Sequence, residues 1–382
     1  MYCAFVLLAA CSLVYWLTLA GLAIRTFSAL KTVASLPDEQ RAHWPVVSIV
    51  IAARDEGAHI GEALEAKLND GYPALQVVLV DDRSTDDTGL QARAVNDPRL
   101  TVTRVEVLPE GWLGKLNALQ HGLQVATGQW ILFSDADVHL APGTLTRLIS
   151  WAERDGIDSI AAVPKITPGG PFITAALAAF SRLIITFPRL WAVENPASKA
   201  AFGIGAFNLF RRSALKKTEG LEWLKMEIAD DAALGIMLKR AGARQRVVIA
   251  QEAVSLEFYP SCHAMARALE KNGAMAPAGV TLLGLVMMML LELGYLSALF
   301  TADPRVQLTG LITFGIAALT QLGICRWLRM PSWPAAFPGW GIIPLAAALA
   351  RSAILAWRRG GVKWRGTFYP ISVVRAGMRI KP

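Results

Sequence analysis

Acidic residues gather in three clusters, and each cluster follows a predicted β-strand. The clusters are Asp55-Glu56, the run from Asp81 to Asp87, and Asp135-Ala136-Asp137. Because Asp and Ser after a strand commonly form turns and cap helices, one cluster alone would be weak support for a site. Three clusters at one sheet edge would repel each other unless a cation or hydrogen-bond donors offset their charge. Their joint occurrence therefore indicates one binding site rather than three unrelated turns.

The pair Asp135 and Asp137 has the spacing of a metal site. The two residues are two positions apart, so in an extended backbone both carboxylates point to the same face. Such a pair suits Mg²⁺ or Mn²⁺, which take oxygen ligands and keep open positions for phosphate oxygens. The phosphate-binding patterns GxxxxGK[ST] and GxGxxG do not occur near these strands. We therefore expect any bound nucleotide to be held by carboxylates and a divalent metal, with Asp137 and Asp135 as the metal ligands.

The elements that must position these carboxylates alternate between strands and helices over residues 45–272. The predicted strands are Val47–Ala53, Leu75–Val80, Leu100–Val107, Trp130–Ser134 and Ser159–Val163. The predicted helices are Gly57–Leu68, Thr85–Val95, Lys115–Ala126 and Ala141–Arg154. This order predicts an α/β fold with a largely parallel sheet and helices on both faces. Ligands of such sheets bind at the carboxyl ends of the strands, where the three acidic clusters fall.

The composition indicates a membrane protein. Apolar residues make up 54% of the 382 residues and charged residues only 18%, which excludes a disordered chain, and long uncharged runs exclude a wholly soluble one. The net charge is +8, but the basic excess lies in the apolar C-terminal part. A nucleic-acid-binding protein would carry that excess on its folded domain, so we expect no nucleic-acid partner. The four cysteines form no CxxC pair, which argues against a disulfide framework or a zinc site.

Several uncharged runs are long enough to cross a bilayer. Residues 1–24 predict an N-terminal anchor, and residues 273–300 and 306–325 predict a helical hairpin. A third apolar segment, 330–357, contains four prolines and is expected to be either spanning or re-entrant. The basic tail 358–382 should be cytoplasmic, like the catalytic domain 45–272, which gives a multi-pass protein of the cell membrane. The apolar segment Pro171–Val193 fits either an amphipathic helix on the membrane or an ordinary buried helix.

The motifs in this order resemble glycosyltransferase family 2, whose members have the GT-A fold. The matching stretches are VSIVIAARDEGAHI, VVLVDDRSTDDT, GKLNALQHGL, ILFSDAD and IADDAALGIMLKRAGA, and they cover roughly residues 45–275. Three further stretches, LPEGWLGKLNALQ, EFYPSCHAMARALEKNGA and KWRGTFY, resemble the branch of hopene-associated and carotenoid-type lipid glycosyltransferases.

The resemblance implies a role for each acidic cluster. Asp82 would hydrogen-bond the base of a nucleotide diphosphate, and Ala53 with Asp55 would line the same pocket. Lys115 would lie near the nucleotide. Asp135 and Asp137 would hold the ribose and the metal, which bridges the diphosphate.

The resemblance also implies that Asp231 is the general base, supported by Asp230. The family usually has Glu-Asp at this place, and here the pair is Asp-Asp. An alternative is that the pair only caps the helix Ala232–Ala241. The free N–H groups at the start of that helix are expected to keep the Asp231 carboxylate ionised and ready to accept a proton.

One departure from the family concerns the acceptor side. Family members that extend polysaccharides carry a Gln-x-x-Arg-Trp motif after the base helix, and no QxxRW occurs in this chain. Its absence predicts the transfer of a single sugar rather than polymerisation. The residues placed tentatively on the acceptor side are Trp112, Tyr259, His263 and Lys271.

These patterns together predict an inverting glycosyltransferase that moves one sugar from a nucleotide-diphosphate donor, such as a UDP-sugar, to a lipid or isoprenoid acceptor at the membrane. Three alternatives stay open. The first is a processive membrane polysaccharide synthase. The second is a phosphate-accepting signalling domain, which Asp81-Asp82 and Lys115 match faintly. The third is a transporter, which would need intramembrane polar pairs; only Glu292 and Arg351 qualify, both near segment ends.

Overall fold

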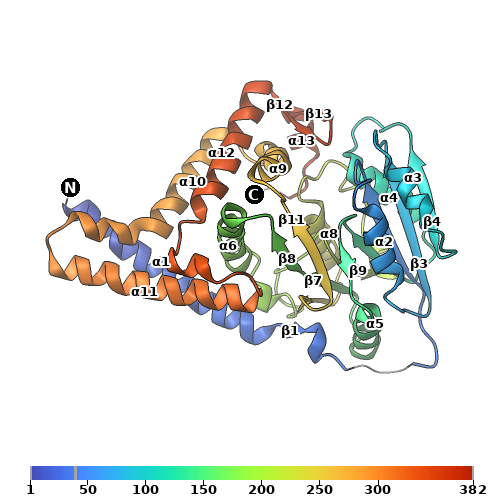
Figure 1. The fold of residues 1–382 in the computed structure, drawn as a ribbon, viewed down its shortest axis with the longest axis horizontal. Coiled ribbons are helices and arrows are strands. Elements are labelled where there is room, and N and C mark those ends of the chain that lie inside the picture. The colour runs from blue at the N-terminus through green and yellow to red at the C-terminus, as the bar shows by residue number, and fades with distance from the viewer. Residues whose placement is uncertain (1, 38–40, 381–382) are drawn as a thin grey trace.

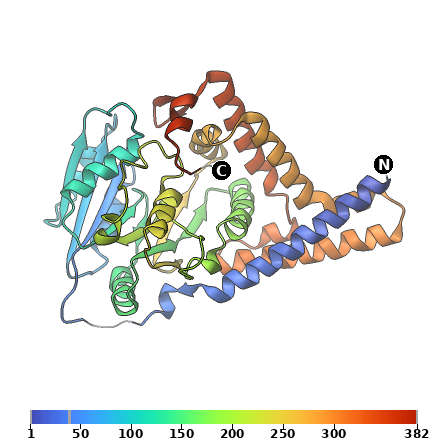
Figure 2. The same ribbon diagram turned by 180° about the vertical axis from the view of Figure 1, so that it is seen from behind.

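The architecture was derived from a computed structural model, which describes residues 2–37 and 41–380. Met1, the first residue of the predicted anchor, and residues 381–382, the end of the predicted tail, lie outside the described residues. An α/β part and a group of long helices that extends away from it make up the molecule (Figures 1 and 2).

The central sheet has eight strands within the described residues, in the order β1-β10-β7-β9-β5-β2-β3-β4. Every neighbouring pair is parallel except the pairs of β9, which runs antiparallel to β5 and β7. The strands are β1 (Lys31–Thr32), β2 (Val47–Ala53), β3 (Leu75–Asp82), β4 (Leu100–Val105), β5 (Trp130–Ser134), β7 (Ser159–Val163), β9 (Asn208–Arg211) and β10 (Gln245–Ile249). The predicted α/β fold with a mostly parallel sheet is confirmed.

Helices cover both faces of this sheet because the side chains of each buried strand alternate between the faces. Ile49 and Ile51 of β2 pack in one core cluster with residues of α2 (Ile60–Leu68) and α5 (Thr144–Asp155). Val50 packs in the opposite cluster with residues of α4 (Gly114–Val125) and α8 (Asp230–Arg240). The elements α4 and α8 thus enter the same side of the sheet, although about a hundred residues separate them in the chain.

Several elements differ from the prediction. The strands β1, β9 and β10 of the central sheet were not predicted. The helices predicted to begin at Gly57, Thr85 and Ala141 each begin three residues later, as α2, α3 (Thr88–Ala94) and α5. For α3 the delay has a local cause. The Asp86 carboxylate accepts hydrogen bonds from the backbone N–H of Thr88, at 3.0 Å, and of Gly57, at 2.9 Å, which forms a turn before the helix starts.

Two smaller sheets lie beside the central one. In the first, β11 (Val254–Phe258) pairs with β6 (His139–Leu140) and β8 (Lys165–Pro168). The second is a hairpin of β12 (Gly361–Trp364) and β13 (Thr367–Pro370). Further short helices are α7 (Arg212–Leu215), α9 (Cys262–Ala268), α13 (Ile371–Gly377), η1 (Val33–Ser35) and η3 (Leu269–Ala274).

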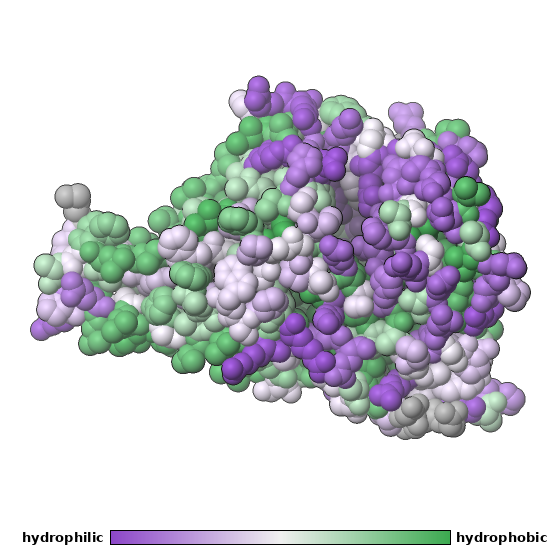
Figure 3. Space-filling model, viewed as in Figure 1, coloured by the Kyte–Doolittle hydropathy of each residue, from purple (hydrophilic) through white to green (hydrophobic). Residues whose placement is uncertain are grey.

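Four helices in the described part of the chain are long and apolar enough to cross a membrane. They are α1 (Tyr2–Ala29), α11 (Pro304–Trp327), the segment Ala278–Phe300 formed by α10 (Ala278–Leu293) and η4 (Gly294–Phe300), and the segment Pro171–Ala192 formed by α6 (Pro171–Thr186) and η2 (Leu190–Ala192). Hydrophobic residues dominate the surface of the arm formed by α1, α10 and α11, whereas hydrophilic residues dominate the α/β part (Figure 3).

The third apolar segment and the predicted tail are folded onto the rest of the protein. Residues 330–357 form η5 (Trp333–Ala336) and most of the 18-residue helix α12 (Ile342–Arg359), which is not one of the four candidate spans. The predicted tail contains the β12–β13 hairpin and α13. Its residues Val362, Tyr369 and Val374 are buried in the same core cluster as α4 and α8, so this segment is not a free tail.

A buried ion pair joins the apolar helices. Arg182 of α6 and Glu292 of α10 are 1% and 0% exposed, and Arg182 Nε donates to Glu292 Oε1 at 2.9 Å. Arg182 also donates to Gln321 of α11, while Tyr15 Oη of α1 donates to Glu292 at 3.0 Å. The sequence prediction named Glu292 but missed Arg182 as its partner. The exposed rings of Phe172, Phe180 and Phe187 lie on the same segment, so Pro171–Ala192 buries one face and exposes apolar side chains on another.

Breaking this pair should destabilise the protein strongly. Glu292→Leu would leave the Arg182 guanidinium buried without a counter-charge, which typically costs about 3–5 kcal/mol. We expect a clear fall in the thermal unfolding midpoint of the detergent-solubilised protein. The double variant Arg182→Met/Glu292→Leu is the matched control, because it removes both charges and should recover most of the loss. Equal unfolding midpoints for Glu292→Leu and the unmodified protein would contradict the buried pair.

Candidate active site

The predicted donor residues lie along the carboxyl edge of three neighbouring strands. β2 lies between β3 and β5, and Ala53 at the end of β2 is in register with Asp81 of β3. Asp82 is the last residue of β3, and Asp135 follows the last residue of β5. The parallel arrangement therefore brings Ala53, Asp82 and Asp135 to one edge, as the sequence predicted.

The carboxylates of Asp55 and Asp82 are both oriented by protein donors. Asp55 has a positive φ of 55°, which is uncommon for a residue other than glycine, and accepts hydrogen bonds from Thr85 N at 2.7 Å and Thr85 Oγ1 at 3.1 Å. Asp82 is ion-paired with Arg83 at 2.8 Å. The start of α4 passes so close that a Cβ on Gly114 would lie 2.4 Å from Asp82 Oδ2. Glycine is required there because α4 approaches this carboxylate closely.

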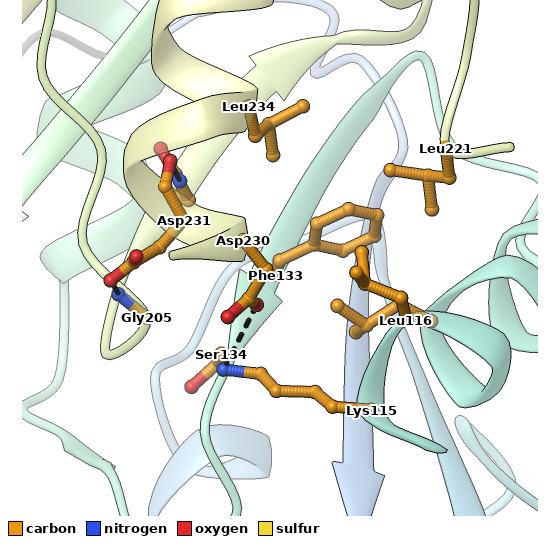
Figure 4. A pocket seen from close by; sticks show the side chains of 11 residues that line it. Lys115, Leu116, Phe133, Ser134, Gly205, Leu221, Asp230, Asp231 and Leu234 are labelled. Carbon is orange, nitrogen blue, oxygen red and sulfur yellow. Dashed lines mark hydrogen bonds and ion pairs between the residues drawn. The ribbon is translucent and has the colours of Figure 1, made fainter. Parts of the chain in front are cut away.

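Lys115 is the centre of the site. Its ammonium group lies 3.3 Å from Asp230 Oδ2 (Figure 4) and 2.7 Å from Asp135 Oδ1. Lys115 therefore joins the end of β5 to the start of α8. Burial lowers the pKa of Lys115, but the charges of Asp135, Asp230 and Asp231 outweigh burial and raise the pKa above its ordinary value. Lys115 is therefore a firmly charged cation at the place where the sequence predicted the nucleotide.

The two predicted metal ligands have opposite electrostatic surroundings. Burial would raise the pKa of Asp135, but Lys115, Lys271 and Arg365 hold it below its ordinary value. The pKa of Asp137 is raised to about 6, first by burial and then by the charges of Asp135 and Glu56. These carboxylates repel each other, and a cation between them would relieve the repulsion.

Oxygen ligands of this kind suit a divalent metal. Among residues 2–37 and 41–380, no group of three or more His, Cys, Asp or Glu side chains is arranged to hold a metal ion. Two carboxylates that leave other coordination positions to water and phosphate oxygens nevertheless fit the way Mg²⁺ is bound at nucleotide sites. The backbone at Gly205 approaches one of these carboxylates closely, since a Cβ there would lie 2.8 Å from Asp135 Oδ2. The residues present therefore fit a divalent cation.

The first two residues of α8 have separate partners. Asp230 faces Lys115, whereas Asp231 Oδ2 accepts a hydrogen bond from the backbone N–H of Gly205 at 2.8 Å (Figure 4). Ala229 is the N-cap residue and makes no side-chain cap, so neither aspartate occupies the capping position that the alternative interpretation assumed. Both line one pocket with Lys115, Phe133 and Ser134.

Opposing effects act on the ionisation of Asp231. The backbone N–H of Ala232 does donate to its carboxylate, at 2.8 Å, and lowers its pKa. Burial and the charge of Asp230 act more strongly, and together they raise the pKa of Asp231 above its ordinary value. A carboxylate with a raised pKa is a stronger proton acceptor, which suits a general base near neutral pH.

Of the four residues placed tentatively on the acceptor side, two have an electrostatic link to the carboxylates of the site. Lys271 lowers the pKa of both Asp135 and Asp231, and Asp135 in turn contributes to raising the pKa of Tyr259 to about 12, after burial. These two residues therefore lie near the carboxylates. Trp112 packs against the core cluster of α4 and α8, and His263 is exposed on α9.

Sequence reasoning missed three residues of this site. Glu56 was noted only as part of a cluster, and Gly205 and Arg365 were not considered. Gly205 had no sequence signal beyond being a glycine between two apolar residues. Arg365 lies in the stretch KWRGTFY, which the sequence analysis singled out but to which it gave no role.

The site lies at the carboxyl edge of an α/β sheet, the edge at which ligands of such sheets bind. Residues 48–218 match the family model described as Glycosyl transferase family 2. Over these residues the chain is similar to glycosyltransferase family 2, as its motifs indicated, and with the mostly parallel sheet the match confirms the predicted GT-A fold. Asp230, Asp231 and the C-terminal hairpin lie beyond the matched residues.

Curated relatives are similar to the chain over part of its length. The succinoglycan biosynthesis protein ExoO of Rhizobium meliloti is 34% identical over 112 residues, which cover 29% of this chain and 31% of that protein. The 4,4'-diaponeurosporenoate glycosyltransferase of Staphylococcus aureus is 25% identical over 193 residues, 50% of either chain. The chain thus spans between 31% and 50% of the length of these two relatives.

A solved structure is also similar to the chain. It is the mannosyltransferase of Pyrobaculum calidifontis in complex with GDP-Man and Mn²⁺, with a TM-score of 0.45, 18% sequence identity and coverage of 97% of each chain.

Proposed function

We propose that the chain is a membrane-embedded, inverting glycosyltransferase that transfers one sugar from a nucleotide-diphosphate donor, such as a UDP-sugar, to a lipid or isoprenoid acceptor. One observation carries this proposal. Lys115 bridges Asp135, on the donor edge of the sheet, and Asp230, beside the candidate base Asp231, in a protein whose described residues also include four helices long and apolar enough to cross a membrane. Donor site, base and membrane segment thus belong to one folded unit.

The chemistry follows from the charges. When the sugar leaves the donor, the diphosphate gains negative charge, which Lys115 stabilises from a fixed position. A divalent cation bound by Asp135 and Asp137 would supply further stabilisation of the diphosphate. On the other side of the sugar carbon, the acceptor hydroxyl must lose its proton as it attacks, and Asp231 would accept that proton. Asp230 keeps Lys115 in place and, by its charge, raises the pKa of Asp231.

The nucleotide would occupy the edge formed by β2 and β3. Ala53 and the oriented carboxylates of Asp55 and Asp82 would line the base pocket, as the family resemblance implies. Arg83 would have to share Asp82 with the base, because the two side chains are paired in the structure. The family match argues for this arrangement and against the alternative of a phosphate-accepting signalling domain.

The membrane arrangement is part of the proposal. We place α1, the segment Ala278–Phe300 and α11 across the bilayer, with the catalytic domain and the C-terminal hairpin on the cytoplasmic side. Two crossings then separate the catalytic domain from the hairpin, so both face the same compartment. Residues 330–357 would enter the membrane without crossing it. Tyr295 Oη donates to Pro338 O at 2.8 Å, close to the buried Arg182–Glu292 pair, and α12 then leads back to the hairpin.

Incubation of the detergent-solubilised protein with nucleotide-sugars and extracted lipids tests this function. With a divalent metal present, we expect one lipid class to gain the mass of a single sugar unit. The matched control is the Asp231→Asn variant, which should bind the same donor without forming product. Long chains released early would instead support the processive synthase, and a protein that binds no nucleotide-sugar would contradict the proposal.

A further inference from the structure

The C-terminal hairpin β12–β13 lies against the donor edge of the catalytic domain. Arg365, at the tip of the hairpin, donates from Nη1 to the backbone carbonyl of Arg54 at 2.9 Å and from Nη2 to Glu56 Oε1 at 2.7 Å. At the other end of the hairpin, Tyr369 Oη accepts a hydrogen bond from the backbone N–H of Gly114, at 3.3 Å. The hairpin therefore spans from the Asp82 region to the loop after β2.

The conformation of the tip is unusual for arginine. The two turn residues, Arg365 and Gly366, have φ angles of 46° and 79°. Two-residue hairpin turns with both φ angles positive favour Asn or Asp before Gly, because most side chains are strained there. A non-glycine residue held in this region points to a function for its side chain.

The hairpin is fixed to the site through the neighbouring helix η3. Glu270 accepts hydrogen bonds from Arg351 and Arg359, both of α12, and Arg351 lies at 3.3 Å. The ammonium group of the next residue, Lys271, lies 4.4 Å from the centre of the Trp364 ring, directly before the tip. These contacts hold Lys271 and Arg365 on the same side of the site as Asp135, whose pKa both residues lower.

The charge balance at this edge leaves the Arg365 cation available for an anion. Its side chain is 53% exposed, and the one carboxylate to which it is ion-paired in the described structure belongs to Glu56. Glu56 is itself one of the carboxylates that repel Asp137. The diphosphate is the anionic group of the proposed donor, and a guanidinium group binds phosphate oxygens with two parallel hydrogen bonds.

On the basis of the proposed function, we infer that Arg365 binds the diphosphate of the nucleotide-sugar and that the β12–β13 hairpin forms a wall of the donor site. The family model ends at residue 218, so this wall comes from a part of the chain outside the matched domain. The hairpin follows α12 directly, so the donor site is complete only when the C-terminal apolar segment has folded.

Binding measurements on the full-length, detergent-solubilised protein test this inference. UDP, GDP and the matching nucleosides are titrated, and the nucleotide that binds the unmodified protein is used for the variants. Arg365→Gln should weaken binding of the nucleoside diphosphate roughly 10–100-fold, the value of a hydrogen-bonded charge contact, and should change binding of the nucleoside less than about twofold. Lys363→Gln removes one positive charge from the same hairpin and should leave both affinities unchanged.

A second variant separates phosphate binding from a structural role. Glu56→Gln breaks the same ion pair but keeps Arg365. If Arg365 binds phosphate, Glu56→Gln should keep or increase the affinity for the diphosphate. Three results would each overturn the inference and leave the proposed function intact. Arg365→Gln could leave the affinity for the diphosphate unchanged, or it could lower the affinities for diphosphate and nucleoside equally. Glu56→Gln could lower the affinity for the diphosphate as much as Arg365→Gln does. If the unmodified protein binds neither UDP nor GDP, both the inference and the proposed function fail.

Discussion

Asp231→Asn is expected to lower turnover ~10²–10⁴-fold, the usual effect of losing a positioned general base. The amide keeps the shape of the carboxylate and can still accept the hydrogen bond from Gly205 N–H through its oxygen. The amide cannot take up the proton that the attacking hydroxyl of the sugar acceptor must lose. Donor binding should be retained, because Asp55, Asp82 and Asp137 lie on other elements. The measurement is turnover at saturating donor, together with donor affinity measured without acceptor.

Asp230→Asn is the matched comparison, because it makes the same change one residue earlier. Asp230 pairs with Lys115 at 3.3 Å, so its loss should cost less turnover than the loss of Asp231. If Asp230→Asn has no measurable turnover and Asp231→Asn has nearly normal turnover, the base is Asp230 instead.

The pH dependence of turnover should differ between the unmodified protein and the Asp230→Asn variant. Asp231 must be ionised to act as a base, so turnover falls as the pH is lowered through its pKa. Burial and the charge of Asp230 raise that pKa, and the fall should therefore begin at a higher pH than for an ordinary aspartate. Asp230→Asn removes a negative neighbour and frees Lys115 to interact with Asp231. Both changes lower the pKa, so the acidic limb should move to lower pH; a shift to higher pH would contradict this assignment.

Asp137→Asn is expected to abolish the effect of divalent metal on donor binding. Removing a residue that only hydrogen-bonds to a metal ligand typically lowers metal affinity roughly 10–100-fold. Removing a ligand itself should lower metal affinity at least as much. UDP or GDP affinity is measured with Mn²⁺ or Mg²⁺ and again with chelator. The unmodified protein should lose affinity when chelator is added, whereas the variant should bind weakly under both conditions.

The control for this experiment is Asp97→Asn. Asp97 is paired with Arg99 at 2.6 Å in the turn before β4, away from the carboxylate pair of the site. It undergoes the same chemical change and should keep the full response to metal. If Asp137→Asn also keeps that response, Asp137 is not a metal ligand.

The sequence by itself determined the parts of the site that depend on local pattern. The buried strands β2, β3 and β5 are mostly apolar, and each is followed by or ends in a polar segment. Parallel neighbours share a carboxyl edge, so Ala53, Asp82 and Asp135 had to come together once the sheet was correctly predicted. The long uncharged runs likewise indicated α1 and α11, because bilayer thickness sets a minimum length that is visible in one dimension.

The tertiary structure decided the interactions between distant segments. The contact of Lys115 with Asp230, the pairing of Arg182 with Glu292 and the docking of Arg365 on Glu56 join residues that are 110 or more positions apart. No periodicity encodes such pairs, since they depend on how whole elements pack. The net direction of the Asp231 pKa shift was not visible in the sequence for the same reason. The local helix terminus favours the ionised carboxylate, but burial and the charge of Asp230 outweigh it, and only the folded structure sets their balance.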